Sequence, residues 1–90
     1  MAQSERVRAL KQRLRPGVFV QTVISGRVAT VLGGEPNEGL RSPGREKVAV
    51  TYRIASGVTK GRRVRKYWYL ENVLIAHPEA VRAAKKRNLL

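Results

Sequence analysis

The chain has 90 residues, the length of one small domain. It contains no cysteine, which excludes disulfides and thiolate metal sites. Nineteen Lys and Arg residues stand against six Glu and no Asp, and the net charge of +13 makes a polyanion the first partner to consider. No apolar run reaches transmembrane length and no secretory signal is visible, so we expect a cytoplasmic protein that does not bind membranes.

Arginine dominates the cations, with 13 of the 19. Its planar guanidinium pairs with phosphates and stacks on rings, which suits a nucleic-acid surface. A surface that only needs to be solubilised usually mixes both signs of charge. The composition therefore favours nucleic acid, DNA or RNA, as the partner.

The first part of the chain predicts a helix followed by two strands. Residues 4–14 form the helix, with Ser4 as its N-cap, and "RPG" at 15–17 ends it. Residues 18–24 and 27–32 are rich in β-branched side chains, and the "SG" between them indicates a turn. The second strand is nearly all apolar, so we expect both of its faces to be covered.

A long loop then leads into a hairpin. Residues 33–46 carry Gly, Pro and Asn without periodicity, and loops of this length are often functional or disordered. Residues 47–54 alternate between apolar and other side chains, which predicts a half-buried strand. Residues 55–61 connect it to a partner strand over 62–70.

The chain ends in "LENV" at 70–73, which indicates one tight helical turn, a short strand at 74–76 and a helix over 78–88. Pro78 is favourable at the first position of that helix. The two terminal helices carry narrow apolar stripes, formed by Val7, Leu10 and Leu14 and by Ala80, Val81, Ala84 and Leu89.

This order of elements describes a single domain over residues 1–90 that is mainly β: a five-stranded SH3-like small barrel, residues 17–76, flanked by N- and C-terminal α-helices. An open three-stranded sheet with two helices is the alternative. The segment "RPGVFVQTVISGRVATVL", with the pattern G-x-V-x-x-V at 26–31, resembles the opening of KOW-type SH3-like barrels. The resemblance covers about residues 15–76, although the loop at 33–46 is longer than in that pattern. Such barrels occur in ribosomal, transcription, chromatin and adaptor proteins, so the resemblance implies a non-catalytic binding module.

The densest chemistry lies in "RRVRKYWYLENV", residues 62–73. Strand side chains alternate between faces, so Val64, Lys66, Trp68 and Leu70 share one face and Arg63, Arg65, Tyr67 and Tyr69 share the other. The apolar set predicts a core with Trp68 inside and the Arg/Tyr row outside, suited to phosphates and stacked bases. Two alternatives stay open. The tyrosines could cover a terminal helix, and a bulge would turn Trp68 outward.

The strand over 47–54 supports the outward basic face, since Ala49, Thr51 and Arg53 lie on its non-core side. Cations at the hairpin tip and in the terminal helices add phosphate contacts of low specificity. The predicted nucleic-acid-binding residues are Arg27, Arg53, Lys60, Arg62, Arg63, Arg65, Tyr67, Tyr69, Lys85 and Lys86.

Catalysis and metal binding lack the necessary residues. His77 is the only histidine, and its place before a helix start suggests a structural role. The scattered glutamates form no convincing acid–base pair. We therefore expect no enzyme activity, no cofactor and no metal.

The sequence thus predicts a non-catalytic nucleic-acid-binding protein of low sequence specificity, with duplex DNA slightly favoured over RNA and a chromatin-like or regulatory role. It would be associated with the nucleoid or a ribonucleoprotein. The alternative is a protein-binding module that docks on a larger assembly, such as a ribosome, RNA polymerase or phage particle, through the loop at 33–46.

Overall fold

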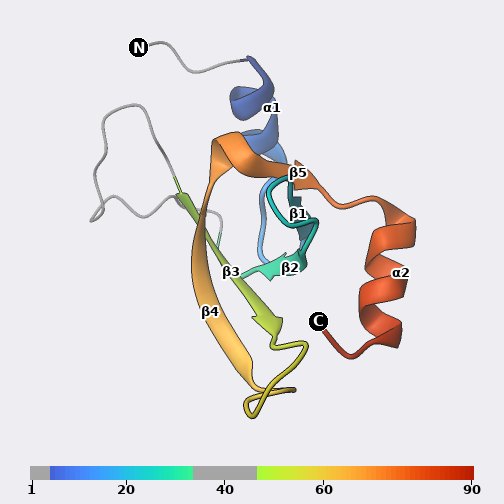
Figure 1. The fold of residues 1–90 in the computed structure, drawn as a ribbon. Helices are drawn as coiled ribbons and strands as arrows, with labels where there is room; N and C mark the ends of the chain where they lie inside the picture. Colours follow the sequence, from blue (N-terminus) through green and yellow to red (C-terminus); the bar gives the residue numbers. More distant parts are fainter. Residues whose placement is uncertain (1–4, 34–46) are drawn as a thin grey trace.

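The computed structural model describes residues 5–33 and 47–90. The predicted N-cap Ser4 and nearly all of the predicted loop at 33–46 lie outside these residues. The elements follow the predicted order, with boundaries one or two residues shorter at most ends (Figure 1). They are α1 (Glu5–Arg13), β1 (Phe19–Thr22), β2 (Val28–Val31), β3 (Lys47–Arg53), β4 (Arg63–Tyr69), the 3₁₀ helix η1 (Leu70–Asn72), β5 (Val73–Ile75) and α2 (Pro78–Lys86).

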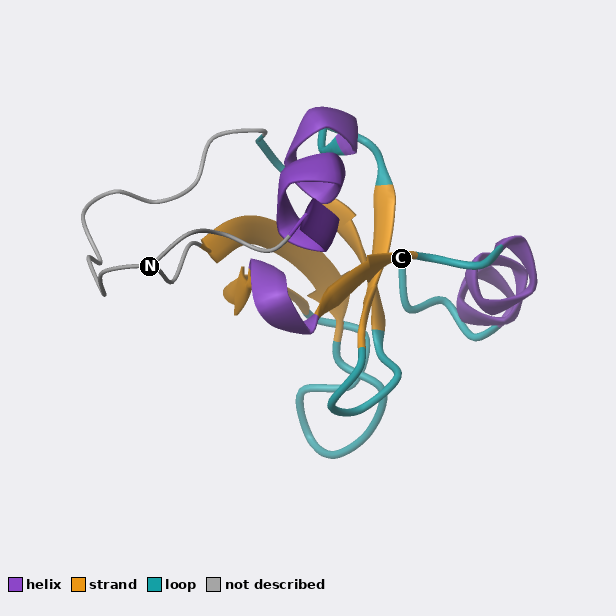
Figure 2. Cartoon of the chain, turned by 90° about the horizontal axis from the view of Figure 1, so that it is seen from above, coloured by secondary structure: helices purple, strands orange, loops and turns teal. Residues whose placement is uncertain are grey.

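The strands form one antiparallel sheet of five strands in the order β4-β3-β2-β1-β5. Five strands were expected, and the three-stranded alternative is wrong. The sheet is open, because β4 and β5 are its two edges and no ladder joins them among the described residues. Seen from above, α1 and α2 lie on different sides of the sheet (Figure 2).

The β3–β4 hairpin is the longest pairing in the sheet. All seven residues of β3 have a partner in β4, from Lys47 opposite Tyr69 to Arg53 opposite Arg63, without a bulge. Val48 lies opposite Trp68, so the predicted alternation is confirmed and Trp68 faces the core. The alternative in which a bulge turns the strand over is excluded by this continuous register.

The main core lies between α1 and one face of the sheet. Ala29, Val31, Val48 and Val50 contribute strand side chains that are almost fully buried. Tyr52 and Trp68 stack across the hairpin, with ring centroids 5.9 Å apart and an interplanar angle of 30°. The predicted stripe of the first helix is confirmed, because all three of its apolar side chains belong to this cluster: Val7, Leu10 and Leu14.

A second, smaller cluster lies on the opposite face of β2, beneath α2. Val28 joins Ala76 and Ala84 there, with Phe19 packed at its border. Both faces of β2 are therefore covered, as its apolar sequence predicts. The weak stripe of the second helix is enough for this contact, since Ala80, Val81, Ala84 and Leu89 all belong to the cluster.

The predicted turns occur where glycine is needed. Gly26 has φ +74°, a left-handed conformation that closes the turn between β1 and β2. The connection between β3 and β4 is closed by two backbone bonds: Ile54 N–H donates to the Arg62 carbonyl at 2.9 Å, and Gly61 N–H donates to the Ile54 carbonyl at 2.8 Å. These two bonds fix the register of β4 against β3.

The edge strand β5 is contacted by an arginine of α1. Hydrogen bonds from Val23 N–H to Asn72 and from Ala76 N–H to Phe19 tie the chain around β5 to the β1 side. In an antiparallel ladder successive residues alternate, so the Val73 carbonyl faces outward. Arg6 donates to this carbonyl at 3.1 Å and also to the Glu71 carbonyl. The guanidinium thus holds α1 against the edge of the sheet.

His77 caps the start of α2. Its Nδ1 accepts a hydrogen bond from Glu79 N–H at 3.2 Å, and Pro78 follows as the first helical residue. This is the structural role expected of the only histidine.

The opposite faces of β4 predict opposite effects of two aromatic substitutions. Trp68→Ala removes a ring from the main core and should lower the free energy of unfolding by about 2–4 kcal/mol. Tyr67→Ala, one residue away on the exposed face, should cost less than about 1 kcal/mol. Urea denaturation followed by circular dichroism measures both, and equal losses would contradict the observed register.

The cap on α2 gives a second prediction. His77→Ala should lower the free energy of unfolding by about 1 kcal/mol, because the amide of Glu79 loses its acceptor. His77→Ser is the matched control, since its hydroxyl restores a capping acceptor. Thermal denaturation should place the Ser variant close to the wild type, and a Ser variant as unstable as the Ala variant would show that the ring itself is needed.

Candidate nucleic-acid interface

The non-core side of the β3–β4 hairpin forms a single basic and aromatic surface, here called the outer hairpin face. Ala49 and Thr51 form its floor, and both are buried although they point away from the core. Their small side chains lie opposite Tyr67 and Arg65, and we attribute their burial to these and other large neighbours. The face consists of Lys47, Ala49, Thr51, Arg53, Arg63, Arg65, Tyr67 and Tyr69.

A hydrogen-bond relay holds one arginine of this face. Arg63 Nη1 donates to Thr51 Oγ1 at 3.3 Å, and the same hydroxyl donates to the Val64 carbonyl at 2.9 Å. Thr51 therefore uses its proton on the backbone and its lone pair on the guanidinium. This arrangement restricts Arg63 while leaving most of its N–H groups for a ligand, because a guanidinium carries five donors.

The aromatic rings of the face each contact a cation. Lys47 Nζ lies 4.6 Å from the centre of the Tyr69 ring, directly across the ladder. Arg65 Cζ lies 5.5 Å from the centre of the Tyr67 ring, on the same strand. Tyr67 is 38% exposed and Arg65 is exposed, so both present surface to a partner. Rings that flank guanidinium groups in this way can stack with bases or pack on sugars.

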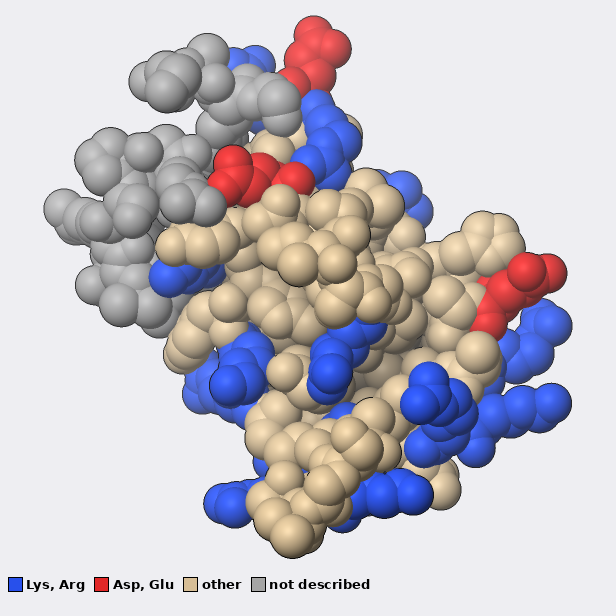
Figure 3. Space-filling view, in the orientation of Figure 1, with Lys and Arg blue, Asp and Glu red and all other residues tan. Residues whose placement is uncertain are grey.

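The charge of this region is of one sign. The stretch 47–70 holds seven cations and no acid. The described acids lie elsewhere, on α1, η1 and α2, and Figure 3 shows Lys and Arg gathered without Asp or Glu around the lower end of the molecule. Arg53 and Arg63 lie directly opposite each other in the ladder, a like-charge pair that destabilises the hairpin.

The other predicted site residues fall into two groups. Lys60 and Arg62 are exposed in the connection at the end of the outer hairpin face, where they extend it. Arg27, Lys85 and Lys86 lie on other elements: Arg27 immediately before β2, and the two lysines on α2, which packs over β2. Lys85 Nζ lies 5.2 Å from the centre of the Phe19 ring.

Lys47 belongs to the face but was not among the predicted residues. The signal was present in the alternation of residues 47–54, which places Lys47 on the same side as Thr51 and Arg53. The predicted alternative for the tyrosines does not hold for the described residues, since neither Tyr67 nor Tyr69 belongs to an apolar cluster beneath a terminal helix.

Residues 5–33 and 47–90 contain neither a metal-binding cluster nor a membrane-spanning helix. No three His, Asp or Glu side chains gather there closely enough to hold a metal ion. Neither α1 nor α2 has the length and apolar character needed to cross a lipid bilayer.

Comparison of the chain with protein-family models, with curated proteins and with solved structures found no match.

The like-charge pair predicts a stabilising substitution. Arg53→Gln should raise the free energy of unfolding by about 0.5 kcal/mol at low ionic strength, because it removes the repulsion from Arg63. The gain should shrink in 1 M NaCl, where the Debye length is about 3 Å. Lys66→Gln, which removes one charge from the opposite face of β4, is the matched control. A gain of the same size in both variants would assign the effect to net charge alone.

Proposed function

We propose that this chain is a non-catalytic nucleic-acid-binding protein that holds the phosphate backbone on its outer hairpin face. Duplex DNA is slightly favoured over RNA, and a chromatin-like or regulatory role fits a binder of low sequence specificity. The observation that carries the proposal is the acid-free row in which Arg53 and Arg63 lie opposite each other. A polyanion bound across this pair would relieve a repulsion that the fold otherwise maintains.

The spacing along β4 supports contact with more than one phosphate. Arg63 and Arg65 are two residues apart on the same face, which separates their Cα atoms by roughly 7 Å. Each guanidinium can form a bidentate pair with one phosphate. Lys60 and Arg62 continue the positive surface into the exposed connection. The cationic side chains therefore lie in a row, as expected for a site that binds a ligand with regularly repeated charge.

The aromatic half of the face adds contact area without base recognition. Tyr67 and Tyr69 follow the two arginines on the same side of β4, and each ring already contacts a cation. A flat ring beside a guanidinium packs on any sugar or base, because every base has a π face. We infer that the face contributes affinity and orientation, and that sequence preference is weak.

We also infer that this open sheet is an SH3-like, KOW-type small barrel that is not closed between β4 and β5, as the finer description of the fold. The hairpin β3–β4 and the 3₁₀ helix η1 immediately before the last strand support it. Modules of this kind use small sheets as binding surfaces, which is consistent with a site built on strands.

A salt series with blunt duplex DNA tests the proposed function. The logarithm of the binding constant should fall linearly with the logarithm of salt concentration, with a slope of about −0.9 for each phosphate neutralised. Arg65→Gln should weaken binding about three- to tenfold and reduce the magnitude of this slope by about one. Fluorescence anisotropy with a labelled 20-base-pair duplex measures both quantities.

Lys66→Gln is the matched control, because Lys66 follows Arg65 in sequence and lies on the other face of β4. It should retain most of the affinity. Binding that is unchanged between 50 and 200 mM salt, or an equal loss in both variants, would reject the outer hairpin face as the site. The same assay with structured RNA shows which nucleic acid is preferred.

A further inference from the structure

An open cleft lies where β2 and β3 separate. Their ladder contains only two pairs, Thr30 opposite Thr51 and Val31 opposite Val50, although both strands continue toward the same end. Continued by two residues, the register would place Val28 opposite Arg53. The strands instead diverge, and the cleft between them has a volume of about 360 Å³. This is within the range of roughly 300–1,000 Å³ of small-molecule sites.

The C-terminal segment replaces β2 as the partner of β3 at this point. Arg53 N–H donates to the Leu89 carbonyl at 2.8 Å, where an unbroken ladder would supply the Val28 carbonyl. In an antiparallel sheet each residue of a central strand directs both its N–H and its C=O to the same neighbouring strand, and successive residues alternate between the two neighbours. Thr22 N–H of β1 donates to the Arg27 carbonyl, so Arg27 faces β1 and the next residue, Val28, faces away from β1. The polar backbone groups of Val28 are therefore directed toward the cleft.

An aromatic column ends at the wall of the cleft. Trp68 stacks on Tyr52, and Arg27 Cζ lies 4.5 Å from the centre of the Tyr52 ring. The guanidinium of Arg27 thus lies against the Tyr52 ring, and the residue is exposed. A guanidinium plane held in this way can stack a nucleobase on its outer side.

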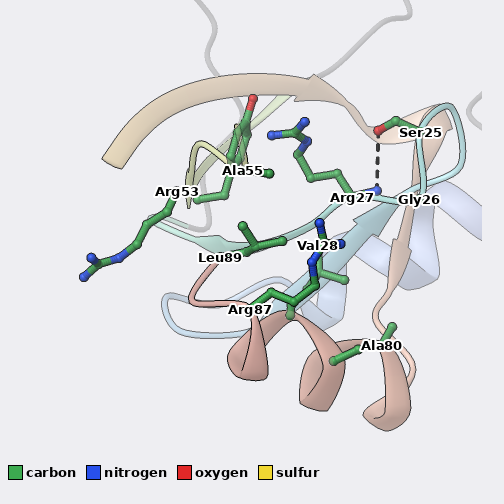
Figure 4. Close-up of a pocket in the computed structure, with 12 residues that line it drawn as sticks. Ser25, Gly26, Arg27, Val28, Arg53, Ala55, Ala80, Arg87 and Leu89 are labelled. Atoms are coloured by element: carbon green, nitrogen blue, oxygen red, sulfur yellow. Dashed lines mark hydrogen bonds between the residues drawn. The ribbon is translucent and has the colours of Figure 1, made fainter. Parts of the chain in front are cut away.

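The opposite wall is α2 together with the C-terminal segment. Figure 4 shows Arg87 extending from the end of α2 toward Val28, whereas the side chain of Arg53 points away from the cleft. Arg27 and Arg87 therefore supply positive charge from the two sides. Within the described part of the chain neither forms an ion pair with a carboxylate, and no acid lines the cleft. The remaining surface is largely apolar, with Val28, Ala80, Ala83, Ala84 and Leu89.

We propose that this cleft binds a nucleotide, with the base between Arg27 and the apolar wall and the phosphate on Arg87. The apolar wall distinguishes the cleft from a simple anion site, because inorganic phosphate would make no apolar contact with Ala83, Ala84 and Leu89. The backbone groups of Val28 can hydrogen-bond to the edge of the base. The same ligand chemistry is offered by a free nucleotide and by an unpaired nucleotide at the end of a nucleic-acid strand. Binding of an unpaired nucleotide at a strand end deepens the proposed function and rests on it. Binding of a free nucleotide is independent of the proposed function.

Titration with AMP, followed by NMR of the backbone amides, tests the site. Saturable shifts should centre on Arg27, Val28, Arg53 and Leu89. Adenosine and inorganic phosphate should each bind at least about tenfold more weakly than AMP, since each lacks one half of the ligand. Arg87→Gln should weaken AMP binding about tenfold, the loss expected for a hydrogen bond to a charged group. Arg27→Gln should weaken it about tenfold as well, because the base loses the guanidinium plane on which it stacks.

Arg82→Gln is the matched control, because Arg82 is an exposed arginine of α2 that does not line the cleft. It should bind AMP like the wild type. Absence of saturable shifts in the cleft, or an equal loss in Arg82→Gln, would overturn the proposal. Phosphate binding as tightly as AMP would also overturn it, since the apolar wall would then contribute nothing.

Duplex DNA with a single-stranded overhang distinguishes the two sources. If the cleft takes an unpaired nucleotide, the overhang duplex should bind more tightly than a blunt duplex of the same length, and Arg87→Gln should abolish that difference. Saturable AMP binding without an overhang preference identifies a free nucleotide as the ligand.

Arg65→Gln separates the cleft from the outer hairpin face. It should weaken blunt-duplex binding and leave AMP binding unchanged. Failure of the proposed function would thus appear as absent duplex binding, and failure of the cleft as absent AMP binding.

Discussion

The alternation of side chains along the β3–β4 ladder is the constraint on which the rest of the molecule depends. Seven consecutive pairs without a bulge assign every side chain of the hairpin to one of two faces. Trp68 and Tyr52 are thereby committed to the core, and Arg65 and Tyr67 to the outside. A slip of one residue would exchange the two sets. Core packing and the basic surface are therefore two results of the same pairing.

This small fold carries a concentrated positive charge on one hairpin. Stretch 47–70 contains no carboxylate to neutralise its cations. Within the described residues two of these cations, Lys47 and Arg65, contact aromatic rings instead, as Arg27 does outside the stretch. A ring attracts a cation through its quadrupole without cancelling the charge. The electrostatic field of these cations therefore still reaches a ligand, whereas a salt bridge to an acid would largely cancel that field.

Much of this organisation was predictable, because it follows from local rules. Period-two alternation placed Trp68 inside, the dipeptide at Gly26 predicted its turn, and Pro78 marked the start of α2. The position of Arg27 was not predictable, since its contact with Tyr52 depends on where β2 leaves β3. Likewise, no local signal indicates that the Leu89 carbonyl takes the place of a strand partner for Arg53. Tertiary packing decides when a distant segment replaces a strand as hydrogen-bond partner, and the local sequence pattern does not encode that packing.

The contact of Arg6 with the Val73 carbonyl has a consequence for self-association. An open sheet has two edges, and an unpaired edge is a template on which another chain can add a strand. At β5 the Val73 carbonyl is already engaged by the guanidinium, so a strand that pairs with this carbonyl would first have to displace Arg6. At β4 the cations Arg63, Arg65 and Lys66 repel a second copy of the same chain. Both edges of the open sheet thus carry features that oppose the addition of a strand, and the positive charge that we propose to bind nucleic acid is one of them.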